Sequence, residues 1–521
     1  MYLTQGLQRM LQQEPNHLAT IYRGRRQTYR ELGQRVSRLA GALRSLGMNS
    51  GDRVGMLALN SDRYLEYMLA TWWGGGVLNP VNIRWSVPEI VFSLDDCDTG
   101  ILIVDDHFLP MVEQIRATAR RAPIVIHAGD GLAPEGMYAY EQLIAESAPI
   151  ADAGRGGDDL ASIMYTGGTT GLPKGVMQSH MNLWSSAIAR AAQFPALDNC
   201  RGLHAAPLFH TAAMARAVGM FVVGGTHVLI PAFDALEILQ TIEREQVNEM
   251  LLVPTMLQAM VMHPDFANYD LSSFKRLAYG ASPISPTLLE KAMVALPGIE
   301  FMHAYGLTEA APVVSVSPHS SHGPEGIASG RVRSVGRGGY GGYGGMVRVV
   351  DENGDEVPRG TVGEIVACGP NIMQGYWNRP EETAKALKNG WLHTGDGAYM
   401  DEDGYLFIVD RLKDMIVTGG ENVFSAEVEN VIARHPDVAM CAVIGIPHER
   451  WGEAVHAVVV RTPGSELTEA QLREHCASHI AGFKCPKSVD FTAALPLSAA
   501  GKILKRDLRE PYWKDQARAV N

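Results

Sequence analysis

Residues 165–175 read YTGGTTGLPKG, and this stretch limits both the fold and the chemistry. An apolar run from Leu160 to Met164 precedes it and predicts a strand, and we expect a helix from His180 onwards. Glycines let backbone N–H groups approach phosphate oxygens, while threonine hydroxyls and Lys174 add donors and a positive charge. The stretch is not a Walker A motif, because Gly175 follows the lysine where that motif needs Ser or Thr. It therefore predicts a phosphate-binding loop and disfavours a P-loop kinase or GTPase.

Strands and helices alternate on both sides of this loop. On its N-terminal side the apolar spacing predicts helices over 32–46 and 64–73 and strands over 54–59 and 101–104. On its C-terminal side it predicts strands over 222–230 and 250–253 and helices over 235–246 and 254–262. This order is typical of α/β proteins, in which mostly parallel sheets carry helices on both faces.

The chain changes character after about residue 331. Short strands separated by turn signals, such as DENG at 351–354 and DEDG at 401–404, predict a small antiparallel sheet or barrel. From about residue 413 a compact α/β unit begins, with helices over 426–434 and 469–479 and strands over 439–444 and 454–460. Residues 336–345 read GRGGYGGYGG, which is typical of a flexible loop, and a nucleotide-cradling loop is the alternative.

The charge balance and the cysteines exclude several classes of protein. The chain has 521 residues, and 45 Lys and Arg against 57 Asp and Glu give a net charge of −12. Bulk charge of this sign disfavours binding to nucleic acid or to anionic membranes. None of the six cysteines forms a CxxC pair or a zinc-ligand spacing, so neither a disulfide scaffold nor a structural zinc site is expected.

The sequence predicts a cytoplasmic protein without a membrane span. Residues 1–17 lack the basic region and apolar stretch of a signal peptide. The most apolar stretch, 219–235, is interrupted by glycines, a histidine and a proline, and no run of 18 apolar residues occurs. The last five residues carry no targeting signal.

Further motifs accompany the glycine-rich loop in a characteristic order. They are PLFH at 207–210, YGASP at 279–283, YGLTE at 305–309, HTGD at 393–396, DRLKD at 410–414 and GKIL at 501–504. Together they resemble the adenylate-forming superfamily of acyl-CoA synthetases, nonribosomal-peptide adenylation domains and luciferases, over residues 28–509. The family's loop usually has Ser where this chain has Gly167, which removes one hydroxyl donor.

The resemblance implies the domain organisation. A large N-terminal adenylation domain over residues 1–410 would bind ATP and the acid, and would contain two α/β sheet subdomains and a small β-barrel-like subdomain. A hinge over 411–414, with Lys413 at the pivot, would join it to a small mobile α/β domain over 415–521.

The resemblance also implies the nucleotide site. Tyr305 would stack on adenine, and Asp396 would take both ribose hydroxyls. The full set expected to bind ATP or AMP is Thr166, Gly167, Gly168, Thr169, Thr170, Lys174, Ala281, Ser282, Pro283, Tyr305, Asp396 and Arg411.

Four residues are expected to be catalytic by the same resemblance. Thr308 would bond the α-phosphate, and Glu309 would hold Mg²⁺, which prefers few carboxylates and many phosphate oxygens. Lys502, in the C-terminal domain, would drive adenylation. His210 would lie at the entrance of the acid pocket, near the α-phosphate.

The acid pocket and the CoA path are implied in the same way. Residues 212–214 read Ala-Ala-Met, and we see no Asp or Arg placed to bind an ammonium group or a second carboxylate, which favours a monocarboxylic fatty or aryl acid. His303 stands where many relatives have Gln, and it either bonds a polar group of the acid or packs behind the pocket. Small residues at Gly419 and Gly420 would let the pantetheine arm of CoA pass. The expected pocket residues are Met214, Tyr279, Gly280, His303, Ala304 and Gly306, with 211–213 beside them.

The activity implied is that of an AMP-forming carboxylic acid–CoA ligase that uses ATP, Mg²⁺ and CoA. The acid would first become an acyl-adenylate and then a thioester. The adenylation step needs no general base, because a carboxylic acid is ionised near pH 7. The absence of a GxSxG motif agrees with this. The alternatives are a ligase that passes the acyl group to an amine or a carrier protein, and a catalytically inactive acyl or nucleotide sensor. The expected partners are small molecules, and the sequence allows a homodimer.

Overall fold

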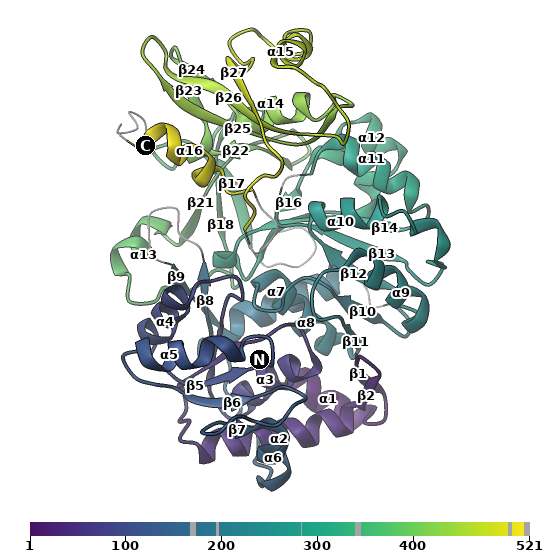
Figure 1. Ribbon diagram of the computed structural model, residues 1–521, viewed down its shortest axis with the longest axis vertical. Coiled ribbons are helices and arrows are strands. Elements are labelled where there is room, and N and C mark those ends of the chain that lie inside the picture. The colour runs from purple at the N-terminus through teal and green to yellow at the C-terminus, as the bar shows by residue number, and fades with distance from the viewer. Residues whose placement is uncertain (167–172, 194–196, 283, 339–344, 499–502, 515–521) are drawn as a thin grey trace.

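The computed structural model describes residues 1–521 apart from 167–172, 194–196, 283, 339–344, 499–502 and 515–521 (Figure 1). The N-terminal residues build one end of the long axis, and the C-terminal residues form a smaller unit at the other end (Figure 1). Sheets and helices alternate through the whole chain, which confirms the α/β fold class.

The first sheet lies at the N-terminal end and is parallel at its centre, in the order β19-β9-β8-β4-β3-β5-β6-β7. Its strands are β3 (Arg53–Leu57), β4 (Val77–Pro80), β5 (Thr99–Val104), β6 (Ile124–His127), β7 (Tyr138–Ala139), β8 (Leu160–Thr166), β9 (Lys174–Ser179) and β19 (Gly375–Tyr376). The helices of this region are α1 (Gln5–Gln13), α2 (Tyr29–Ser45), α3 (Asp62–Trp73), α4 (Val87–Asp96), α5 (Val112–Thr118) and α6 (Tyr140–Glu146). The N-terminus of α2 is fixed by a capping box between Thr28 and Glu31. The helices and strands predicted before the glycine-rich loop are confirmed to within a few residues.

The second sheet is larger, and its parallel part carries helices on both faces. Its parallel strands are β1 (Leu18–Tyr22), β10 (Arg201–His204), β11 (Thr226–Leu229), β12 (Glu249–Leu252), β13 (Arg276–Gly280) and β14 (Glu300–Gly306), with β2 (Arg25–Thr28) antiparallel at the edge. The helices are α7 (His180–Gln193), α8 (Thr211–Val223), α9 (Ala235–Glu245), α10 (Pro254–Val261) and α11 (Pro286–Ala295). Along β12, Met250 and Leu252 pack with α9 to α11, whereas Glu249 and Leu251 face α7 and α8.

The prediction of a strand over 222–230 is wrong at its start. Val222 and Val223 belong to the last turn of α8, and Gly224 ends that helix in the left-handed conformation with φ 74°. A buried helix and a buried strand both appear as an apolar run, so the sequence around Phe221 did not separate them.

The antiparallel strands expected as a separate sheet or barrel are hydrogen-bonded into the second sheet. β16 pairs with β15 on one side and with β22 on the other, which makes the connection. The strands of this part are β15 (Val313–Ser317), β16 (Gly336–Gly338), β17 (Met346–Val350), β18 (Gly363–Cys368), β20 (Leu387–Lys388), β21 (Trp391–Met400) and β22 (Tyr405–Arg411), with short helices α12 (Pro324–Ala328) and α13 (Pro380–Ala386). Of the glycine-rich segment at 336–345, residues 339–344 lie outside the described residues.

The C-terminal unit has its own sheet and core. Its strands are β23 (Ile416–Thr418), β24 (Glu421–Val423), β25 (Val438–His448), β26 (Gly452–Arg461) and β27 (Ser488–Phe491), and its helices are α14 (Ser425–Ile432), α15 (Glu469–Ala477) and α16 (Lys505–Trp513). A 3₁₀ turn over Leu412–Asp414 precedes it, where the hinge is predicted. No helix among the described residues combines the length and the apolar composition that a membrane crossing requires.

Candidate active site

A carboxylate held by two donors lies where the antiparallel and parallel parts of the large sheet meet. Tyr305, near the end of β14, donates its hydroxyl to Asp396 Oδ2 at 2.7 Å. Arg411, which is paired with Asp396 across β21 and β22, places Nε 2.9 Å from Oδ1. Burial, and then the charge of Asp396, raises the pKa of Tyr305 far above its usual value, so the phenol stays a donor. The Asp396 carboxylate is therefore fixed in direction and keeps lone pairs for vicinal hydroxyls of a sugar.

A second carboxylate belongs to the YGLTE motif. Glu309 sits in a 3₁₀ turn over Thr308–Ala310, and its Oε1 accepts a hydrogen bond from the Tyr376 hydroxyl at 2.8 Å. The Nζ of Lys174 lies 5.2 Å from the centre of the Tyr376 ring. The Thr308 carbonyl is held by Gln178 Nε2 at 2.7 Å. Tyr376 thus links the turn that carries Glu309 to the strand that carries Lys174.

The surroundings of Glu309 fit a magnesium ion that arrives with nucleotide phosphates. Within the described ranges, no group of three or more His, Cys, Asp or Glu side chains could enclose a metal ion. Mg²⁺ is commonly bound by one or two carboxylates together with substrate phosphates. Glu309 would supply such a carboxylate from its Oε2, since Tyr376 orients the other oxygen.

Two glycines of the predicted pocket are required by close backbone packing. A Cβ at Gly280 would overlap the carbonyl oxygen of Ala304, and a Cβ at Gly306 would overlap that of Pro312. Ala281 follows Gly280 with φ 66°, an uncommon conformation for alanine. The loop at the end of β13 therefore lies directly on the end of β14.

Tyr279 and His303 stack on each other, with ring centroids 4.7 Å apart. Tyr279 packs in the apolar cluster of α10 and α11, and its hydroxyl contacts His322 Nε2 at 2.8 Å. Burial lowers the pKa of His303 to about 4. This geometry favours the packing alternative for His303, because its ring lies on the Tyr279 side of the sheet, opposite α7 and α8.

The other described site residues lie at loop and helix ends. His210 is the N-cap residue of α8 and packs on Phe209, with Met214 buried one turn later. Thr166 ends β8, and its hydroxyl lies 3.5 Å from the Lys174 carbonyl. Ser282 is half-buried in the loop after β13.

Gly419 and Gly420 form the exposed turn between β23 and β24, with φ 61° and 86°. The Gly419 amide donates to the Trp451 carbonyl at 2.9 Å. Several predicted residues lie outside the described residues: Gly167, Gly168, Thr169, Thr170, Pro283 and Lys502. The backbone of Lys413 lies in the turn over Leu412–Asp414.

Sequence-family models match most of the chain. The model of the AMP-binding enzyme matches residues 7–377, and that of the AMP-binding enzyme C-terminal domain matches residues 427–502. The chain belongs to the AMP-binding enzyme family. This membership confirms the resemblance to adenylate-forming enzymes.

Individual relatives of this AMP-binding enzyme cover nearly its full length. A feruloyl-CoA synthase of Amycolatopsis sp is 40% identical over 505 residues, which is 97% of this chain and 98% of that protein. A fatty acid–[acyl-carrier-protein] ligase, ScoC of Streptomyces coeruleorubidus, is 37% identical over 514 residues, 98% of this chain and 96% of that protein. The crystal structure of ATP-bound MatB from Rhodopseudomonas palustris superposes with a TM-score of 0.87 at 32% identity, and covers 99% of both chains.

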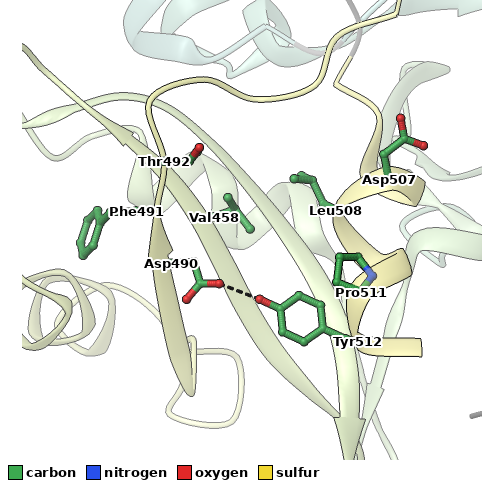
Figure 2. Close-up of a pocket in the computed structure, with 8 residues that line it drawn as sticks. All are labelled: Val458, Asp490, Phe491, Thr492, Asp507, Leu508, Pro511 and Tyr512. Carbon is green, nitrogen blue, oxygen red and sulfur yellow. Dashed lines mark hydrogen bonds between the residues drawn. The ribbon is translucent and has the colours of Figure 1, made fainter. Parts of the chain in front are cut away.

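The AMP-binding enzyme also has a cavity away from this site, in the C-terminal unit. It has a volume of about 410 Å³ and lies between α16 and strands β26 and β27 (Figure 2). Tyr512 crosses it and donates its hydroxyl to Asp490 Oδ2 at 2.7 Å (Figure 2). None of the residues that line this cavity is among the predicted site residues. The cavity beneath α16 is therefore not the predicted nucleotide site.

Two polar clusters of this AMP-binding enzyme are not among the residues predicted from the sequence. One surrounds Glu249 under α8, and the other joins Asp410 to Ser425 beside the predicted hinge. A signal for the first was present, since Arg216 interrupts the apolar run of 211–223. Its partner could not be read from the sequence, because Glu249 stands 33 residues further along the chain.

Proposed function

We propose that this AMP-binding enzyme joins an aryl monocarboxylic acid to CoA, with an acyl-adenylate as intermediate and AMP as product. The acid–CoA ligase activity agrees with the names of its relatives. The co-substrates are ATP, which is used with Mg²⁺, and CoA. The proposal that the enzyme binds ATP is supported by the Asp396 carboxylate, which Tyr305 and Arg411 hold in a fixed direction. The aryl class rests on the 40% identity to a feruloyl-CoA synthase over 97% of the chain.

In the first step the carboxylate of the acid attacks the α-phosphorus of ATP, and pyrophosphate leaves. Negative charge accumulates on phosphoryl oxygens, so catalysis consists mainly of positioning and positive charge. Asp396 holds the ribose, Thr308 and the glycine-rich loop donate to the phosphates, and Lys502 adds a cation. Glu309 would hold Mg²⁺, which would supply positive charge to the phosphate oxygens. His210 stands at the mouth of the acid pocket.

In the second step the CoA thiol attacks the acyl-adenylate, and AMP leaves. The exposed Gly419–Gly420 turn lies beside Trp451 and carries no side chain that would obstruct a pantetheine arm. Rotation about Lys413 would bring this turn to the site and withdraw Lys502. The domain boundaries at 410 and 415 belong to the same proposal.

A second acceptor is the main competing function. ScoC, 37% identical, is named as a ligase for an acyl carrier protein, so a carrier or an amine could replace CoA in this chain. An inactive sensor is disfavoured, because Glu309, Asp396 and Lys502 are all present. A cytoplasmic location and a homodimer stay predictions of the sequence.

The test measures AMP, pyrophosphate and acyl-CoA with ATP, Mg²⁺ and a panel of aryl and aliphatic acids, with and without CoA. We expect AMP and thioester in equal amounts, only with CoA and best with an aryl acid. Pyrophosphate release that CoA does not accelerate would favour the amine or carrier acceptor. No release with any acid would favour the sensor. Asp396→Asn should raise the KM for ATP, and Asp403→Asn, in an exposed turn of the same hairpin, serves as control.

A further inference from the structure

Three residues at the centre of the large sheet are partly exposed. Leu251 on β12, Ala278 on β13 and Ala304 on β14 are half-buried, although helices cover this face. Leu251 and Ala278 are neighbours in the strand register, and Ala304 lies beside Gly280, one step nearer the strand ends. Solvent reaches side chains in such positions only where a cavity separates the sheet from the helices. We call the space that these three positions border, between the sheet and α7–α8, the channel.

Helix α8 presents a matching small residue to this channel. Ala212 is half-buried, and Arg216 follows four residues later on the same face of the helix. Arg216 reaches the sheet, since Nη1 lies 3.2 Å from the Leu203 carbonyl and Nη2 lies 3.0 Å from the Glu249 carbonyl. The helix rises about 9 Å between His210 and Arg216, at about 1.5 Å per residue. Arg216 thus lies at the end of the channel opposite to His210.

The far end of the channel is charged. Glu249 Oε1 accepts from Arg190 Nη2 at 2.5 Å and from Arg216 Nη2 at 3.3 Å, and Arg276 lies 3.7 Å from Oε2. Arg276 also pairs with the half-exposed Glu300 at 2.8 Å. We call Arg190, Arg216, Glu249 and Arg276 the floor cluster. It sets three guanidinium groups against Glu249, and one of them, that of Arg276, also against Glu300.

The neighbouring histidines add no charge to the floor cluster. His204 Nε2 and His227 Nδ1 are 3.0 Å apart, and burial lowers both pKa values, that of His227 to about 3. In the described part of the chain, the Nε of Arg216 has no hydrogen-bond acceptor. The floor therefore offers a donor on Arg216 and an acceptor on Glu249 to a polar group that enters the channel.

We infer that Arg216 and Glu249 form the floor of the acid pocket and select aryl acids with a hydroxyl group at the end opposite to the carboxylate. This inference rests on the proposed ligase function and names its substrate class. The hydroxyl would accept from Arg216 and donate to Glu249. A 4-hydroxycinnamate has a vinyl group and a benzene ring between its polar ends, which suits an acid whose carboxylate lies near His210 and whose hydroxyl lies near Arg216, six residues further along α8. A long alkyl chain would instead desolvate the buried charges without bonding them.

The experiment compares kcat/KM for 4-hydroxycinnamate, cinnamate, propionate and decanoate. The enzyme should prefer 4-hydroxycinnamate to cinnamate by about tenfold or more, because a site built for a hydroxyl rejects the analogue without it. Arg216→Leu should abolish this preference and raise the relative use of decanoate, whereas Arg216→Lys should restore part of it. Arg244→Leu, an exposed arginine on α9, is the matched control and should leave the ratio unchanged.

A second variant keeps the inference testable if Arg216→Leu does not fold. Ala212→Leu fills the channel above Arg216 and breaks no hydrogen bond, so it should lower kcat/KM for 4-hydroxycinnamate about tenfold while propionate is still used. An unchanged ratio of 4-hydroxycinnamate to cinnamate in Arg216→Leu, or full use of 4-hydroxycinnamate by Ala212→Leu, would overturn the inference. An enzyme that activates no acid would instead refute the proposed function.

Discussion

The floor cluster and a second buried polar cluster, beside the predicted hinge, are built from different groups. The floor cluster consists of arginines and a carboxylate, and all its members belong to the large sheet and its helices. The hinge cluster, which we define as Asp410, Ser425, Glu429 and Lys505, contains a lysine and a hydroxyl. Asp410 Oδ2 accepts from the Ser425 amide at 2.6 Å and from its hydroxyl at 2.5 Å, and Lys505 pairs with Glu429 at 2.7 Å.

The difference corresponds to the position of each cluster relative to the predicted hinge. Asp410 ends β22 on one side of residues 411–414, and Ser425 begins α14 on the other side. The hinge cluster therefore crosses the predicted pivot, and it also contacts α16, the helix that follows Lys502. The floor cluster crosses no such boundary. In the proposed function, the floor cluster would fix the shape of the acid pocket, whereas the hinge cluster would hold the orientation of the two proposed domains.

The largest expected effect is on the floor cluster. Glu249→Ala leaves three guanidinium groups without their shared carboxylate, and arginine stays charged when buried. The loss should be about 3–5 kcal/mol, as for other buried pairs with one partner removed. Thermal and denaturant unfolding measure it, with Glu290→Ala on the exposed face of α11 as control. A variant as stable as the parent would show that the arginines do not depend on Glu249.

The hinge cluster should control the balance of the half-reactions. Ser425→Ala removes the hydroxyl's bonds to Asp410 and to Lys505 but keeps the amide bond to Asp410, which weakens the orientation seen here by about 1.5 kcal/mol. The ratio of pyrophosphate exchange to thioester formation from added acyl-adenylate should then change by about tenfold. Ser478→Ala, on the exposed end of α15, is the control. If both half-reactions fall together, the cluster supports folding and not orientation.

Unfolding at acidic pH tests how much the Glu249 carboxylate of the floor cluster contributes to stability. Burial would raise the pKa of this carboxyl, but the guanidinium groups of Arg190, Arg216 and Arg276 lower it overall. A lowered pKa means that the stabilisation is present above the unfolded value of about 4.5 and is lost as the pH falls towards the folded value. The slope is at most about 1.4 kcal/mol per pH unit for one proton. Unfolding scans from pH 5 to 3 should show this slope, and it should be absent in Glu249→Gln.

The smallest expected effect concerns an exposed link between the units. Arg84 Nη1 donates to the Ser498 carbonyl at 3.1 Å, just before the segment that contains Lys502. An exposed hydrogen bond of this kind contributes at most about 1 kcal/mol. Arg84→Ala should change the adenylation rate less than about fivefold. A larger loss would show that this link contributes more to orientation than the Asp410–Ser425 bond.

Short motifs contain three of the residues predicted for the nucleotide site. Tyr305, Asp396 and Arg411 each stand in a distinctive string, and the structure brings their side chains into contact across three strands. The proposed pocket floor was not predicted from the sequence, because Arg216 and Glu249 come into contact only when α8 packs on β12. The strand predicted over 222–230 began too early for a similar reason, since only tertiary packing decides that Val222 is helical.

The close packing of Gly280 on Ala304 and of Gly306 on Pro312 has a consequence for how specificity can change. On the sheet side, the wall of the proposed acid pocket is backbone at these positions, and any larger residue there would overlap a carbonyl oxygen. Variation in the sequence can therefore reshape the pocket far more easily from α8, at Ala212 and Arg216. Two enzymes with this architecture could use different acids while their strand ends remain superimposable. Directed evolution towards a new acid should accordingly accumulate its first successful changes on a single helix.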